Sequence, residues 1–195
     1  MRTIRSVTRF LAPVAALAVA AGCGASGSTS THAATTTKQA SGGSSVAMVQ
    51  KCSTSDLEIW LGLGGGGAAA GSTYYPLEIT NISNHRCRLF GFPGVSAISV
   101  SGRQLGSPAQ RDRSHPTYHV SLLPGSTVHT VVRIADVLNF PASRCKPVAA
   151  SGLRVYPPDQ TEAAEIPFGF RGCSVKGPIF LSVQAVQPGV GIPGR

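Results

Sequence analysis

Cysteine is the residue type whose chemistry and spacing say most in this sequence. Cys23 ends the segment Ala20-Ala21-Gly22-Cys23, after an apolar run over residues 10–21 and three arginines within the first nine residues. This order is typical of a bacterial export signal that ends at a lipid-modified cysteine, although Ala20 stands where Leu is usual. The apolar run is shorter than the roughly 20 residues that a membrane-spanning helix needs. We therefore expect cleavage of residues 1–22 and a diacylglyceryl thioether on Cys23.

The remaining cysteines form an even set, which suits an exported protein. If Cys23 carries lipid, two disulfides account for every other sulfur atom. Disulfides persist in oxidising compartments, whereas cytosolic thiols stay reduced. The alternatives are buried, unpaired thiols or a metal cluster, and the lack of a Cys-x-x-Cys motif or a closely spaced Cys/His pair argues against the cluster. The four residues are Cys52, Cys87, Cys145 and Cys173.

Two histidines form a candidate metal site if the chain turns where the sequence suggests. A three-residue hairpin loop at residues 123–125 would place His119 opposite His129 on an outer surface. Cross-strand Cβ atoms lie about 5 Å apart, so neutral imidazoles at these positions could chelate Cu²⁺ or Zn²⁺, with His115 as a third ligand. We favour the simpler interpretation, two solvent-facing histidines, and assign no metal or cofactor.

A basic loop and an aromatic edge are the other candidate binding features. Arg103, Arg111 and Arg113 lie in the loop-like segment 102–115, and guanidinium groups match carboxylate and phosphate. Asp112 partly neutralises this loop, so an ordinary solvated loop is the alternative.

The second feature combines Trp60 and Tyr74 with residues 64–71, which could form an apolar contact patch at a sheet edge or simply cap the core. The glycines at 64–67 lack the Lys-Ser/Thr of a phosphate-binding P-loop and are interpreted as a mobile loop between strands.

Catalytic motifs are missing from the sequence. No Gly-x-Ser-x-Gly elbow occurs, and the acidic residues form no obvious pair for acid/base chemistry. We assign no catalytic residue and expect no enzyme, with a cell-envelope hydrolase as an alternative that an acid/base cluster in the fold would favour. The acidic residues are Asp56, Glu58, Glu78, Asp112, Asp136, Asp159, Glu162 and Glu165.

The elements expected to position these residues are short strands. Residues 23–50 are rich in Gly, Ala, Ser and Thr and predict a flexible tether with a reach of roughly 30 Å. From Cys52 onward, apolar residues alternate with polar ones, as in strands with one buried face. Turn signals recur about every 8–12 residues, which predicts an all-β, antiparallel β-sandwich of seven or eight strands over residues 51–187. Residues 188–195 are predicted to be a disordered tail.

Several segments of this sandwich resemble the actinobacterial domain-of-unknown-function family 4232. They include Cys52 and the strand after it, Tyr75-Pro76-Leu77-Glu78-Ile79-Thr80-Asn81, Cys87-Arg88-Leu89-Phe90-Gly91-Phe92-Pro93-Gly94-Val95, Gly102-Arg103-Gln104-Leu105-Gly106, Leu122-Leu123-Pro124-Gly125, and the stretch from Cys145 through Leu153-Arg154-Val155-Tyr156-Pro157-Pro158 to Cys173. The resemblance implies an exported, often lipid-anchored, immunoglobulin-like sandwich with an N-terminal and a C-terminal cysteine pair. It implies no activity.

Local pairing is the economical connectivity among the three that four cysteines allow. We therefore predict disulfides Cys52–Cys87 and Cys145–Cys173, each closing a loop of about 30 residues.

Composition narrows the class of partner. The formal charge is +9, and loss of the three arginines of the signal leaves 9 − 3 = +6. Nucleic acid is a poor partner for an exported chain, whereas a basic surface is drawn to anionic headgroups or envelope polymers. We expect a non-catalytic binding or envelope-interaction domain, lipid-anchored at the extracytoplasmic face of the cell membrane, whose partner is an anionic polymer or a protein. A weak Cu/Zn-binding module is the alternative, and the sequence gives no indication of oligomeric state.

Overall fold

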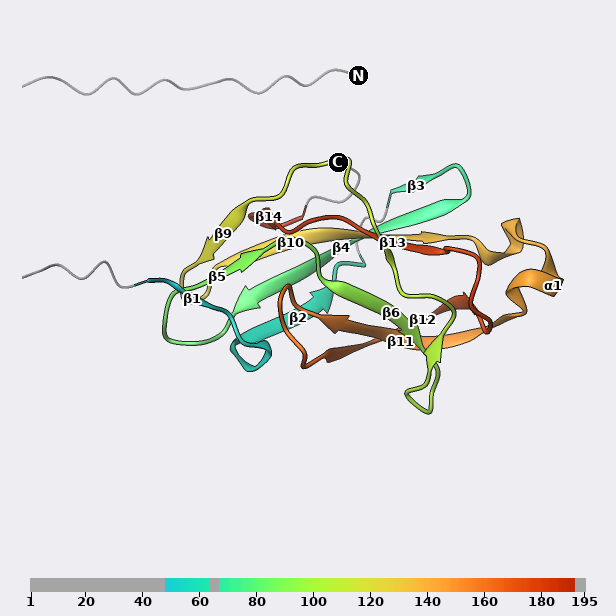
Figure 1. The fold of residues 1–195 in the computed structure, drawn as a ribbon, viewed down its shortest axis with the longest axis horizontal. Coiled ribbons are helices and arrows are strands. Elements are labelled where there is room, and N and C mark those ends of the chain that lie inside the picture. The colour runs from blue at the N-terminus through green and yellow to red at the C-terminus, as the bar shows by residue number, and fades with distance from the viewer. Residues whose placement is uncertain (1–47, 64–66, 192–195) are drawn as a thin grey trace, which may run out of the picture. The chain divides into compact units, whose positions relative to one another are not determined.

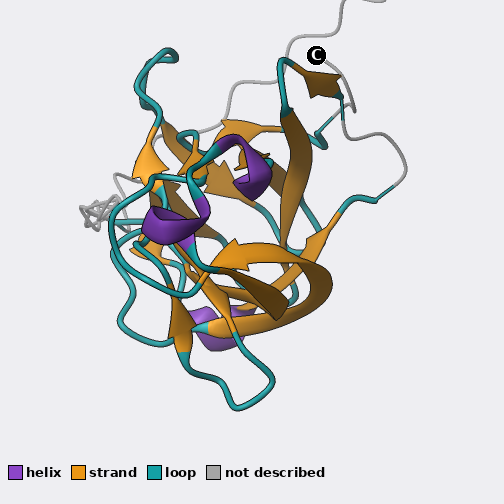
Figure 2. Ribbon diagram, turned by 90° about the vertical axis from the view of Figure 1, so that its right-hand side faces the viewer, coloured by secondary structure: helices purple, strands orange, loops and turns teal. Residues whose placement is uncertain are grey.

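The alternating apolar pattern folds into three β-sheets. The computed structural model describes residues 48–63 and 67–191, and strands dominate them (Figures 1 and 2). Eight strands in this part of the chain have four or more residues, in agreement with the predicted number. These longer strands are β2 (Leu57–Leu61), β4 (Ser72–Asn81), β5 (Cys87–Phe90), β6 (Gly94–Ile98), β9 (His119–Leu122), β10 (Thr127–Ala135), β11 (Pro147–Tyr156) and β12 (Ala164–Cys173).

Short elements complete the sheets and their connections. The short strands are β1 (Gln50–Lys51), β3 (Ala68–Ala69), β7 (Gln104–Leu105), β8 (Gln110–Arg111), β13 (Leu181–Val183) and β14 (Gln187–Pro188). The helical turns are η1 (Thr54–Asp56), η2 (Val137–Asn139) and α1 (Ala142–Cys145). The helical turn η2 lies just before Pro141. The proline ends that turn but also serves as the N-cap of α1, because its fixed φ suits a helix start.

The sheets stack as a sandwich around two adjoining cores. The largest sheet has the order β2-β4-β10-β13-β8, with β3 on β4 and β14 on β10, while the other two run β1-β5-β9 and β12-β11-β6-β7. Inward residues of the large sheet, such as Leu77 and Val132, pack with Leu153 and Val155 of β11. Farther along, Ile79 packs with Leu89 and Val120 of the three-stranded sheet. The all-β sandwich fold is therefore confirmed.

Both predicted disulfides are present. Cys52 bonds to Cys87 at the start of β5, and Cys145 bonds to Cys173 at the end of β12. All four cysteines are fully buried. The two disulfides therefore hold the start of β5 and the end of β12 in the core.

The predicted hairpin between β9 and β10 is wrong. β9 pairs with β5, whereas β10 pairs with β4, β13 and β14. The chain crosses between layers at residues 123–126, where the amide of Gly125 donates to the carbonyl of Asn81. Crossing lets Val120 and Val128 face one core from opposite layers, whereas a hairpin would place them on one sheet.

Several expectations concern residues that the structure does not describe. The export signal (residues 1–22), lipidated Cys23, the tether up to residue 47 and part of the glycine loop (residues 64–66) lie outside the described residues. Residues 188–191 are the described part of the predicted C-terminal tail, residues 188–195. In the structure, Pro188 belongs to β14, and the amide of Gly191 donates a hydrogen bond to Glu78.

Candidate functional site

The outer face of the three-stranded sheet carries a cation and two stacked rings. Alternation on β5 and β9 turns Leu89 and Val120 into the core, which leaves Arg88, Phe90 and His119 on the opposite face. The Phe90 and His119 rings stack, with centroids 4.3 Å apart. Arg88 is held against the first strand, because its Nε donates to the carbonyl of Val49. The Cys52–Cys87 disulfide lies directly before Arg88 and fixes this part of β5.

A crossing segment adds more positive charge beside these rings. The short strand β8 pairs in parallel with β13, and this pairing fixes the backbone at Arg111. Its guanidinium carbon lies 5.7 Å from the centre of the Phe92 ring, a cation–π distance. Arg113 and His115 follow in the exposed stretch before β9. Asp112, between the two arginines, accepts a hydrogen bond from the amide of Ser114.

The carboxylate that lines this surface is Asp159, in the turn between β11 and β12. Its carboxylate forms an ion pair of 2.9 Å with Lys51 of β1. The pKa of Asp159 is lowered, chiefly by the hydrogen bond and charge of Lys51 and further by the positive charges of Arg111 and Arg88. These arginines are therefore close enough to stabilise a negative charge at this position.

Together these side chains line two adjoining hollows that share Phe90 and Asp159. Their volumes are about 460 and 230 Å³. Four cations face one carboxylate there, and within the described residues none of the three arginines belongs to an ion pair. We call this surface the arginine–aromatic groove; it comprises Lys51, Arg88, Phe90, Phe92, Arg111, Arg113, His115, His119 and Asp159.

The chemistry of the groove is that of anion binding. A guanidinium group keeps its charge at any physiological pH and presents a planar set of donors that match carboxylate or phosphate oxygens. The Phe90 and Phe92 rings add apolar faces beside these donors. The groove extends over two hollows, so it suits an extended anion better than a single small ion.

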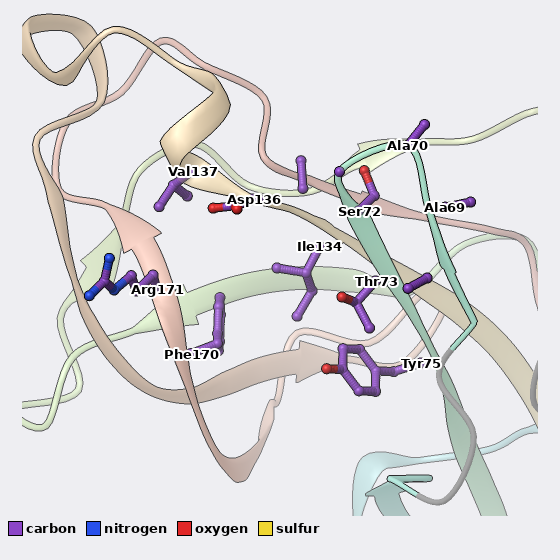
Figure 3. Close-up of a pocket in the computed structure, with 13 residues that line it drawn as sticks. Ala69, Ala70, Ser72, Thr73, Tyr75, Ile134, Asp136, Val137, Phe170 and Arg171 are labelled. Carbon is purple, nitrogen blue, oxygen red and sulfur yellow. The ribbon is translucent and has the colours of Figure 1, made fainter.

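Another hollow lies at the end of the sandwich away from β1 (Figures 1 and 3). It has a volume of about 470 Å³ and runs between the β3–β4 hairpin, the end of β10 and β12. Figure 3 shows the hydroxyl groups of Thr73 and Tyr75 directed towards the side on which Phe170 lies. The hydroxyl of Ser72 is buried without a hydrogen-bond partner among the described residues. This cleft offers hydroxyls and apolar walls, whereas the groove concentrates fixed charge and is the stronger candidate.

A buried carboxylate lies on the outer face of the large sheet. Glu78 of β4 is 1% exposed, since the chain crosses over it after β14. Oε1 accepts the amide of Gly191 at 2.9 Å, and Oε2 has no partner among the described residues. Burial raises the pKa of Glu78, while the Gly191 amide and the charge of His129 oppose this rise. The covering segment is also held by His129, whose Nδ1 donates to the carbonyl of Gly189.

The predicted site residues separate into different regions. Arg111, Arg113 and His115 line the groove, but Arg103 lies next to β7 and is not part of its lining. His119 also lines the groove, whereas His129 pairs with Glu78 in another sheet, so the face-to-face pair behind the metal hypothesis is wrong. No group of three or more potential metal ligands occurs among residues 48–63 and 67–191.

The two aromatic residues lie apart along one face of the large sheet. Trp60 is 44% exposed and lies opposite Glu78, whereas Tyr74 lies four residues before Glu78 on β4, opposite Arg133 of β10. Part of the glycine segment, residues 67–71, forms the β3–β4 hairpin, and most of it lines the cleft.

Sequence reasoning missed the residues that complete the groove. Lys51, Arg88, Phe90, Phe92 and Asp159 come from three segments distant in sequence. The alternation on β5 was a usable signal, because it places Arg88 and Phe90 together on the face away from the core.

Comparisons with known proteins agree with the fold. In the described part of the chain, no helix combines the length and apolar character needed to cross a bilayer. A search of curated proteins finds no match. The family model described as "Domain of unknown function (DUF4232)" matches residues 52–187, from the first disulfide cysteine to β14. The match spans most of the sandwich, so the chain belongs to the DUF4232 family.

Proposed function

We propose that this protein is an exported lipoprotein whose β-sandwich is a non-catalytic binding domain for an anionic polymer of the cell envelope. Residues 1–22 direct export, Cys23 carries the lipid, and residues 23–50 tether the domain at the extracytoplasmic face of the membrane. The arginine–aromatic groove holds the polymer. The observation that carries this proposal is the convergence of Lys51, Arg88, Arg111 and Arg113 on one surface with a single carboxylate.

The geometry of the groove favours binding over chemistry on the ligand. Its charges belong mainly to guanidinium groups, which stay protonated and do not transfer protons at physiological pH. The Val49 carbonyl holds Arg88, and the Phe92 ring holds Arg111. These two side chains therefore lose less conformational entropy when a ligand binds. A polymer that carries phosphate or carboxylate groups at intervals can contact both hollows at once.

Titration calorimetry tests this proposal directly. The purified protein is titrated with linear polyphosphate or polygalacturonate, and with dextran as the uncharged control. We expect heat of binding for both anionic polymers, none for dextran, and weakening as salt rises, because surface charges are screened beyond about 10 Å at 0.1 M.

Matched variants separate the groove from overall charge. Arg111→Ala with Arg113→Ala removes two groove cations, whereas Arg103→Ala with Arg144→Ala removes two exposed cations elsewhere. Exposed ion pairs contribute up to about 1 kcal/mol each, so the groove pair should weaken binding roughly tenfold and the control pair little. Equal losses in both pairs would refute the groove as the binding surface.

A further inference from the structure

The groove lies where the tether enters the domain. The first strand, β1, pairs in parallel with β5, so the chain enters beside Arg88 and Phe90 (Figure 1). Lys51 of β1 is itself part of the groove lining, and Val49 accepts the hydrogen bond from Arg88. The first described residues of the chain therefore lie directly against the arginine–aromatic groove.

Further basic and apolar side chains extend this surface. Arg86 and His85 line a hollow with Met48, Val49 and Gln50, next to the point of entry. Three large apolar side chains at this end are exposed: Met48 by 88%, Phe90 by 42% and Tyr118 by 49%. Cations mixed with exposed aromatic and aliphatic side chains are typical of proteins that lie on an anionic bilayer. We call this surface the tether face; it comprises Met48, Lys51, Arg86, Arg88, Phe90, Arg111, Arg113 and Tyr118.

We propose that the tether face docks on the anionic phospholipid headgroups of the membrane that holds the lipid anchor. The inference rests on the proposed anion-binding groove and names the partner that this groove reaches first. Phosphodiester groups match the guanidinium donors of Arg88, Arg111 and Arg113. The exposed Tyr118 suits the boundary between headgroups and acyl chains, because its ring is apolar and its hydroxyl polar, and Phe90 adds an exposed apolar ring.

The tether makes even a weak contact effective. The Gly-, Ser- and Ala-rich composition of residues 23–50 predicts a reach of roughly 30 Å, which would keep the headgroups within range of the domain. Docking is then an intramolecular step with an effective concentration on the order of millimolar. Because the cleft of Figure 3 lies near β3, at the opposite end of the sandwich from β1 in Figure 1, docking would leave that cleft directed away from the membrane.

The test uses the mature chain, residues 23–195, with Cys23→Ser, so that neither the lipid nor the basic, apolar signal can bind the vesicles. The Cys23→Ser chain is sedimented with vesicles of equal parts phosphatidylglycerol and phosphatidylcholine, and with vesicles of phosphatidylcholine alone, at about 0.1 M salt. We expect binding to the anionic vesicles only. In this background, Arg111→Ala with Arg113→Ala should lower the partition coefficient about 30-fold, since each cation near an anionic surface contributes roughly a factor of five. The control pair, Arg103→Ala with Arg144→Ala, should lower it much less.

Linear polyphosphate serves as the second arm of the experiment. A chain that binds polyphosphate but not the anionic vesicles would overturn membrane docking and leave the proposed polymer-binding function in place. A chain that binds neither would overturn both. Equal losses in the groove pair and the control pair would assign vesicle binding to net charge and would also overturn docking by this face.

Discussion

Glu78 offers a sharp test of the outer face of the large sheet. Its carboxylate is buried under Gly191, with one oxygen bonded to that amide and the other without a partner among the described residues. Glu78→Gln keeps the shape and the acceptor for Gly191 but removes the charge. We expect this variant to change the pH dependence of stability rather than the fold.

The expected direction of the pH dependence follows from the raised pKa of Glu78. When a carboxyl group has a higher pKa in the folded state than in the unfolded state, the folded protein binds more protons between the two values. The stabilisation that comes from this extra proton is therefore complete at a pH below the pKa that Glu78 has in the unfolded chain. It is lost as the pH rises through the higher pKa that Glu78 has in the folded protein. A buried polar atom without a partner costs about 1–3 kcal/mol, and more when it is charged, so replacing the carboxylate by a neutral amide removes part of this cost. Glu78→Gln should thus be more stable than wild type by about 1 kcal/mol at neutral pH and gain least in acid.

Urea unfolding from pH 4 to pH 8 measures this difference, over a range that begins near the ordinary carboxyl pKa and extends well above it. The lowered pKa values of Asp56, Asp112 and Asp159 act in the opposite direction, because their stabilisation is lost as pH falls. Subtracting the wild-type curve from the variant curve cancels these contributions. Glu58→Gln, on an exposed residue of the neighbouring strand, is the control. A variant that loses stability relative to wild type as pH rises would refute the burial argument.

Three further predictions concern the anchor, the disulfides and the β11 strand. Cys23→Ser should abolish lipidation, which detergent-phase partitioning and intact mass would detect; wild-type protein with an unmodified N-terminus would contradict it. Removing the Cys145–Cys173 bridge by two alanines should cost about 3–4 kcal/mol in urea unfolding, given its separation of 28 residues. Gly152→Ala should cost about 1–3 kcal/mol or more, because a Cβ would collide with the backbone carbonyl of Ile166 at a bulge; an unchanged midpoint would contradict this.

Local patterns in the sequence predicted the strands and the disulfides well. Alternation in Leu57–Leu61 reports which face of the strand is buried. In Ser72–Asn81 it identifies Leu77 and Ile79 as core residues, but Glu78 on the opposite face is also buried, because the chain after β14 covers it. Leu63 continues the alternation in sequence but is 64% exposed, because β2 has already ended. The disulfides were predictable since each joins cysteines about 30 residues apart, and local closure costs least entropy.

Strand pairing and the groove were harder to predict for the same physical reason. Val120 and Val128 fit a hairpin as well as a crossing between layers, and only the shared core decides between them. The groove joins Lys51, Arg88 and Asp159 across the fold, and no sequence spacing relates these residues. Basic residues in one loop were a partial signal: Arg111 and Arg113 belong to the groove and Arg103 does not.

Nuclear magnetic resonance tests the central claim, anion binding in the arginine–aromatic groove, most directly. The ¹⁵N-labelled protein is titrated with linear polyphosphate, and the amide shifts are mapped on the fold. We predict that the largest shifts cluster at Lys51, Arg88, Phe90 and Arg111, with saturation at a common affinity. Shifts spread evenly over all basic residues, or centred on Arg103 or the cleft, would contradict the assignment of the groove as the binding surface.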